Sequence, residues 1–316
     1  MKIFDAYLLK WRNISKIGFI FCILGLFFLP SSLLLAGIFL IPSAIIGSFC
    51  NKKNYFKDFY NMPFLICGIL ILINSLMQKF LIPNLFENDW DANLTIAGLA
   101  NWLPFFWFFW SFNTYVNSKF KRKLIAKTLI FGTFPVLITG FGQYFFNWTG
   151  PLEIFNGLII WYQKPIEYPA GLSGLFSNQN YAGSWLNLVW PFCIALALEK
   201  TSAFLKKTFS ISFLISIGFA IFLTNSRNAW SGLLISLPLV VGYESFTWLI
   251  PVLVIIFITI FYTISELFTG EIQDLFREII PERMWMEFSK KGFENIDASR
   301  FEIMKSAIKI SFLRPI

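Results

Sequence analysis

The chain has 316 residues, of which 56% are hydrophobic and only 14% are charged, with a mean hydropathy of +0.64. Soluble domains carry about 25% charged residues, so this composition excludes an ordinary soluble domain and indicates a membrane protein. A net charge of +8 would suggest nucleic-acid binding in a soluble protein. Here the basic residues cluster between apolar segments, as topology signals do, so we expect a lipid bilayer and no nucleic acid as partner.

Residue types that commonly carry catalysis and metal binding are scarce. The chain has no histidine, which removes the commonest general base and the commonest metal ligand. Its four cysteines lie in or beside apolar segments without paired spacing. We therefore expect no disulfide, no metal site and no cofactor.

Nine apolar segments follow one another along the chain, most of them approaching the roughly 20 residues that cross a hydrocarbon core. They predict an all-α fold, a polytopic membrane bundle of about nine transmembrane helices in residues 1–268. Residues 269–316 form a short helical extracytoplasmic tail in this prediction. The segments are Ile17–Leu29, Leu33–Phe49, Met62–Met77, Leu94–Val116, Thr128–Phe146, Tyr181–Leu198, Phe209–Leu223, Ala229–Val241 and Phe246–Phe268.

Basic residues between these segments predict the orientation. With the N-terminus in the cytoplasm, fifteen lysines and arginines lie in inside loops and three lie outside. The turn after the eighth segment carries no basic residue and is the weakest point of this assignment. The tail is then periplasmic, and the sixth and eighth segments both begin on the outer face.

Two polar stretches precede those two segments. The first polar segment, Ser173–Asn180, is a glycine-bearing loop that runs into a hydrophobic helix; Asn178 or Asn180 is a good N-cap for it. The second polar segment, Thr224–Asn228, likewise opens an apolar run. Because helix N-termini carry partial positive charge and unpaired N–H groups, each segment is a candidate anion site.

Arg227 is the only charge in the second polar segment. At a helix N-terminus its charge adds unfavourably to the helix dipole, and a bound phosphate would relieve this conflict. The alternative is an arginine that anchors its helix at the membrane interface. Asn178 and Asn180 have a similar alternative as simple helix caps.

Other polar residues have structural interpretations. Asn74, Asn101, Asn113 and Gln143 lie within apolar segments and are candidates for hydrogen bonds between helices. In the tail, Ser299–Glu302 is a capping box that predicts a helix with Phe301, Met304, Ile308 and Phe312 along one stripe. Such a helix would lie on the membrane face or on the bundle. Arg300 at its start is either an ordinary exposed arginine or a functional one.

Together, Gly174–Gly183, Thr224–Trp230 and Ser299–Ser306 resemble the O-antigen ligase and O-antigen polymerase family in order and spacing. The resemblance implies an all-helical bacterial inner-membrane glycosyltransferase. Its members move glycan from an undecaprenyl diphosphate carrier to a lipid or glycan acceptor in cell-surface polysaccharide biosynthesis. It also implies that Arg227 and Arg300 grip the diphosphate. The substrate-binding residues that we expect are Arg227, Arg300, Ser226, Asn178 and Asn180.

The sequence departs from the family pattern at one catalytic feature. Family members carry a histidine in a large periplasmic loop, whereas this chain has none and reaches Ile316 within that loop. We therefore expect a shortened member that binds the carrier without transferring glycan, and we assign no catalytic residue. Two alternatives are a transporter of a small anion such as bicarbonate and a catalytically silent envelope-assembly protein.

Overall fold

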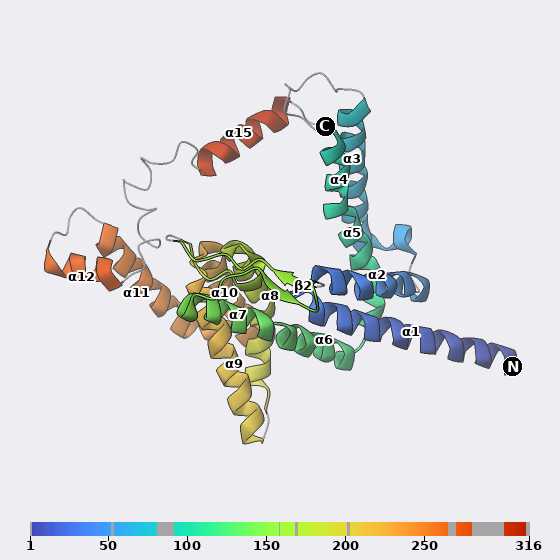
Figure 1. Cartoon of the computed structure of the whole chain (residues 1–316), viewed down its shortest axis with the longest axis horizontal. Helices are drawn as coiled ribbons and strands as arrows, with labels where there is room; N and C mark the ends of the chain where they lie inside the picture. Colours follow the sequence, from blue (N-terminus) through green and yellow to red (C-terminus); the bar gives the residue numbers. More distant parts are fainter. Residues whose placement is uncertain are drawn as a thin grey trace. The chain divides into compact units, whose positions relative to one another are not determined.

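The computed structural model describes residues 2–51, 54–80, 92–157, 159–167, 170–200, 203–264, 270–279 and 300–313. Helices dominate these residues, and the one small sheet has two strands (Figure 1). The α-helices are α1 (Lys2–Phe28), α2 (Leu33–Cys50), α3 (Met62–Phe80), α4 (Ala92–Gly98), α5 (Leu103–Phe112), α6 (Lys119–Gly132), α7 (Phe134–Phe146), α8 (Gln179–Leu198), α9 (Phe204–Leu223), α10 (Arg227–Val241), α11 (Phe246–Ile264), α12 (Glu271–Ile279) and α15 (Arg300–Leu313). The predicted all-α class is therefore confirmed for the described residues, apart from this small sheet.

Within the described residues, six helical stretches are long and apolar enough to cross a membrane, so a multi-pass membrane protein is the best description of the chain. They are Leu33–Cys50, Phe59–Met77, Lys119–Phe146, Gln179–Leu198, Phe204–Leu223 and Tyr243–Ile264. A further apolar stretch, Asn13–Phe28, is shorter, and α10 has 15 residues. Nine spans are thus not confirmed.

The predicted fourth span, Leu94–Val116, is broken in the structure. Its residues form α4, α5 and short 3₁₀ turns instead of one helix. Pro104 helps to explain the interruption: it has no N–H to donate to the carbonyl four residues earlier, so one continuous helix cannot run through it undisturbed. It lies instead in the first turn of α5, where proline is tolerated, and the N-cap Trp102 has non-helical φ and ψ of −126° and −54°.

The chain divides into two compact units. Unit 1 comprises residues 1–29, 33–128 and 309–316, and unit 2 comprises residues 30–32 and 129–308. The predicted boundary at residue 268 is of another kind, because it separates a membrane part from an aqueous tail and not two compact units. That boundary stays a prediction.

Unit 1 contains the helices α1 and α2, and the predicted break between them, residues 30–32, is grouped with unit 2. The buried Ser43 hydroxyl donates to the Gly18 carbonyl over 2.8 Å, and the Tyr115 hydroxyl donates to the Ser43 carbonyl over 2.8 Å. Gly25 permits close approach, since a Cβ there would lie 2.5 Å from Cγ of Leu40. Small residues and hydrogen bonds thus hold these helices together, as is typical in membranes.

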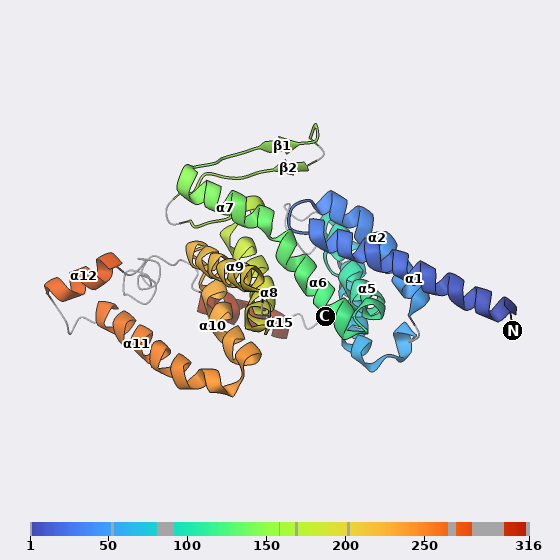
Figure 2. The ribbon, with the colours of Figure 1, turned by 90° about the horizontal axis from the view of Figure 1, so that it is seen from below.

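In unit 2, α8 packs against both α9 and α10 (Figure 2). Many apolar side chains on these helices and on α11 are exposed, which is expected of surfaces that face lipid: Leu188, Ile215, Ile235, Ile255 and Phe257. The loop between α7 and α8 contains an antiparallel hairpin of β1 (Leu152–Ile154) and β2 (Ile159–Trp161), with Leu152 opposite Trp161. This hairpin was not predicted from the sequence.

The tail forms two described helices, α12 and α15. The predicted helix from Arg300 is confirmed as α15, although Ser299 of its capping box lies outside the described residues. Along the predicted stripe, Met304, Ile308 and Phe312 are exposed. Contact of this stripe with a membrane face stays a prediction.

Candidate functional site

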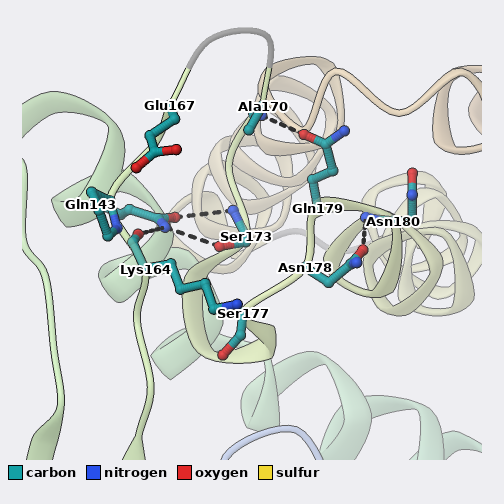
Figure 3. Close-up of a pocket in the computed structure, with 11 residues that line it drawn as sticks. Gln143, Lys164, Glu167, Ala170, Ser173, Ser177, Asn178, Gln179 and Asn180 are labelled. Carbon is teal, nitrogen blue, oxygen red and sulfur yellow. Dashed lines mark hydrogen bonds between the residues drawn. The ribbon is translucent and has the colours of Figure 1, made fainter.

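The loop before α8 is held to α7 by Gln143, which is buried on the inner side of that helix. Its Oε1 accepts from the backbone N–H groups of Ser173 and Gly174 over 3.0 and 2.8 Å. Its Nε2 donates to the Lys164 carbonyl over 2.7 Å and to the Ser173 hydroxyl over 2.9 Å (Figure 3). Gln143 was predicted to bridge helices. Instead it fixes two parts of the loop, at Lys164 and at Ser173–Gly174, to α7.

Of the two predicted N-cap candidates, Asn178 is the N-cap of α8. It has extended backbone geometry, and its side-chain oxygen accepts from the Asn180 N–H over 2.8 Å. The next residue, Gln179, accepts from the Gly171 N–H through its Oε1. The start of α8 therefore has a fixed position relative to the preceding loop.

The structure brings the two polar segments together. The Ser226 hydroxyl donates to Oδ1 of Asn180 over 3.0 Å, although the two residues lie 46 positions apart. Ser226 is the N-cap of α10 and is buried, and its side chain makes no capping bond to its own helix. The N-termini of α8 and α10 thus lie side by side.

Close backbone contacts support this pairing. A Cβ at Gly183 would lie 2.7 Å from Cβ of Ala229, and one at Gly171 would lie 2.4 Å from the carbonyl carbon of Thr224. The Leu172 N–H also donates to the Leu223 carbonyl over 2.9 Å. These contacts require glycine at both positions, because any side chain would force the segments apart.

Arg227 is the first residue of α10, directly after Ser226, and is half-buried. Its charge therefore lies at the positive end of a helix dipole and beside the N-terminus of a second helix. Together these groups produce a positive potential at this end of unit 2. The predicted contributors Arg227, Ser226, Asn178 and Asn180 therefore meet in one place.

Arg300 is the first residue of α15. Its side chain lies outside the described part of the structure. Its predicted cooperation with Arg227 therefore stays a prediction.

A cavity of about 350 Å³ opens in front of the start of α8 (Figure 3). The described residues that line it are Gln143, Lys164, Pro165, Glu167, Ala170, Gly171, Ser173, Ser177, Asn178, Gln179 and Asn180. Arg227 is not among these lining residues, but Asn180 connects the cavity to Ser226 beside it. Asn178 and Asn180 were predicted as binding residues from the sequence, whereas Lys164 and Glu167 were not.

One signal could have indicated those two residues. Lys164 and Glu167 are charged residues in a loop that the positive-inside pattern places opposite the basic clusters. Such charges are not explained by topology, so they are candidates for function.

The described residues contain no group of three histidine, cysteine, aspartate or glutamate side chains placed to hold a metal ion. Comparison of the chain with protein-family models, with curated proteins and with solved structures finds no match. The resemblance to O-antigen ligases and polymerases therefore rests on the motifs alone, and function has to be argued from the site.

Proposed function

We propose that this chain is a membrane protein that binds a glycan linked to undecaprenyl diphosphate at the paired N-termini of α8 and α10. The observation that carries the proposal is the hydrogen bond between Ser226 and Asn180, which places Arg227 beside the start of α8. Two helix N-termini and a guanidinium group suit a diphosphate, because N–H groups and positive charge all favour an anion.

In this proposal the protein belongs to the glycan transferases of cell-surface polysaccharide biosynthesis, in the inner membrane, with this site on the periplasmic side. Arg227, with Arg300, neutralises negative charge on the carrier diphosphate. If transfer occurs, an acceptor hydroxyl attacks the anomeric carbon while the diphosphate departs, and cationic groups stabilise the developing charge. The resemblance of three motifs supports this choice of carrier and acceptor class.

An anion transporter would need polar or charged groups along the membrane-spanning part of its helices. Beyond its first turn, α8 carries no charged residue and only Ser184 and Asn187 as hydroxyl or amide residues. After Arg227, α10 carries no charged residue and only Asn228, Ser231 and Ser236 of these polar types. The only charge on these two helices therefore lies at one end, which favours a surface-bound headgroup over a transported ion.

Substitution of Arg227 tests the proposal. In purified protein reconstituted into nanodiscs, Arg227→Lys should weaken undecaprenyl diphosphate binding about ten- to a hundredfold, because an ammonium group cannot pair with two phosphate oxygens at once. Arg227→Ala should weaken it at least as much. Arg122→Lys, at an exposed arginine of α6, is the matched control.

Undecaprenol without phosphate should bind weakly to the wild type and equally to all variants. Unchanged diphosphate affinity in Arg227→Lys would show that Arg227 only anchors its helix. Displacement of the carrier by millimolar bicarbonate would favour the anion transporter.

A further inference from the structure

The cavity in front of α8 has a different chemistry from the Arg227 end of α10. Among the described residues that line it, only Pro165 and Ala170 have purely apolar side chains, which disfavours a lipid tail as its ligand. Its lining otherwise consists of carboxamides, hydroxyls, Gly171 and two charged side chains. Its volume of about 350 Å³ lies at the low end of the range for small-molecule sites.

Part of this lining is a fixed scaffold. The carboxamide of Gln143 makes four hydrogen bonds to the loop, two as acceptor and two as donor, which is its full capacity. Gln179 and Asn178 each accept one hydrogen bond through their side-chain oxygen within the structure, which orients their carboxamides toward the loop and the start of α8. A preorganised wall of this kind limits the entropy lost when a ligand binds.

The two charged groups lie apart. Figure 3 shows the Lys164 side chain running toward Ser177, whereas Glu167 lies on the other side of Ser173. Both side chains are exposed, and the structure places no ion pair between these two described residues. Over the described lining residues the charges of Lys164 and Glu167 sum to zero, so a second phosphate is disfavoured here. An ammonium group and a carboxylate can each form hydrogen bonds to neutral hydroxyls.

We propose that this cavity binds one neutral sugar unit, the unit of the glycan that is next to the carrier diphosphate. Lys164 donates to sugar hydroxyls, Glu167 accepts from them, and the amides of Asn178 and Asn180 complete the contacts. Asn180 lines the cavity and accepts from Ser226, so the sugar subsite adjoins the diphosphate end without a gap in the chain of contacts. This inference rests on the proposed function for the identity of the neighbouring group.

Free sugars test the subsite without the carrier. Saturation-transfer NMR should be recorded on the whole chain in nanodiscs free of sugar-based detergent. The probes are N-acetylglucosamine, glucose and galactose at up to about 50 mM, because a single sugar is expected to bind in the millimolar range. At least one of them should bind, and Lys164→Gln and Glu167→Gln should each weaken it about tenfold.

Matched controls are Lys206→Gln and Glu153→Gln, which remove the same charges from exposed positions outside the cavity. Both should bind sugar like the wild type. Thermal unfolding of all four variants identifies any that fail to fold. Where a variant fails to fold, Ser177→Ala replaces it, and the expected loss of sugar affinity is smaller.

Three results would overturn the inference. They are the absence of binding by every probe, binding that neither cavity variant changes, and inorganic pyrophosphate binding that depends on Lys164 and competes with sugar. Failure of the proposed function looks different. In that case Arg227→Lys leaves undecaprenyl diphosphate binding unchanged, while free-sugar binding is still sensitive to Glu167→Gln.

Discussion

The two units of this chain use buried polar side chains in different ways. In unit 1, Ser43 and Tyr115 donate to backbone carbonyls within the packed helices, and both bonds serve helix association. In unit 2, Gln143 bonds to the loop before α8, and Ser226, the N-cap of α10, bonds to Asn180 in the first turn of α8. The polar contacts of unit 1 thus lie within packed helices, whereas these contacts of unit 2 gather at helix starts and at the loop beside them.

Sided labelling tests the largest expected difference, that between the two ends of unit 2. In a background with Cys50→Ser and Cys67→Ser, Tyr162→Cys near the cavity should react with an impermeant thiol reagent added from the periplasmic side. Lys206→Cys, at the predicted cytoplasmic end, should not react until the membrane is permeabilised.

Both target side chains are exposed, so burial should not prevent labelling. Equal labelling of the two cysteines, or the reverse pattern, would contradict the predicted orientation. The site would then face the cytoplasm, where the proposed periplasmic reaction does not occur.

Gln143→Leu should have the next largest effect. It leaves the Ser173 and Gly174 N–H groups without their acceptor inside the protein, and each buried unpaired group costs about 1–3 kcal/mol. We expect a loss of about 3 kcal/mol or more in unfolding free energy, together with loss of sugar and carrier binding. Reversible unfolding in detergent, followed by tryptophan fluorescence, measures the first quantity.

Gln143→Glu keeps the acceptor oxygen and should lose less unfolding free energy and less binding than Gln143→Leu. If Gln143→Leu retains wild-type stability and binding, the loop is not held by this residue, and the contrast between the units fails.

Gly171→Ala should cost about 1–3 kcal/mol, because its Cβ would lie 2.4 Å from backbone atoms of Thr224, which cannot move as a side chain could. Gly37→Ala in α2 is the matched control, since nothing lies within 4 Å of its Cβ, and alanine is the better helix former. The change should be neutral or slightly stabilising. Comparable unfolding midpoints for the two variants would show that the polar segments are not in close contact.

Tyr115→Phe should have the smallest effect, about 0.5–1.5 kcal/mol, because it removes one hydrogen bond within unit 1. Tyr243→Phe, at a tyrosine that is 90% exposed, should be silent. Unlike Gln143→Leu, Tyr115→Phe should leave carrier binding unchanged. A loss of binding in Tyr115→Phe would mean that the polar contacts of unit 1 also support the site.

Several elements were predictable because they depend on neighbours in sequence. Apolar runs gave the helices of both units, and the position of Asn178 gave the N-cap of α8. The predicted fourth span is not one continuous helix. Its hydropathy predicted a single helix, and the prediction neglected Pro104, which lacks the backbone N–H that a continuous helix needs. The hairpin of β1 and β2 was missed although Asn156-Gly157, both with positive φ, is a known turn signal.

Hydropathy and capping are local properties, so the sequence alone predicts an apolar, multi-pass helical protein with two polar helix starts. The bond between Ser226 and Asn180, the anchoring of the loop by Gln143, and the shared cavity of Lys164 and Glu167 depend on tertiary packing. These contacts join residues from about 20 to 46 positions apart. They form only where helix packing and glycine contacts bring backbones together, and local sequence does not specify that geometry.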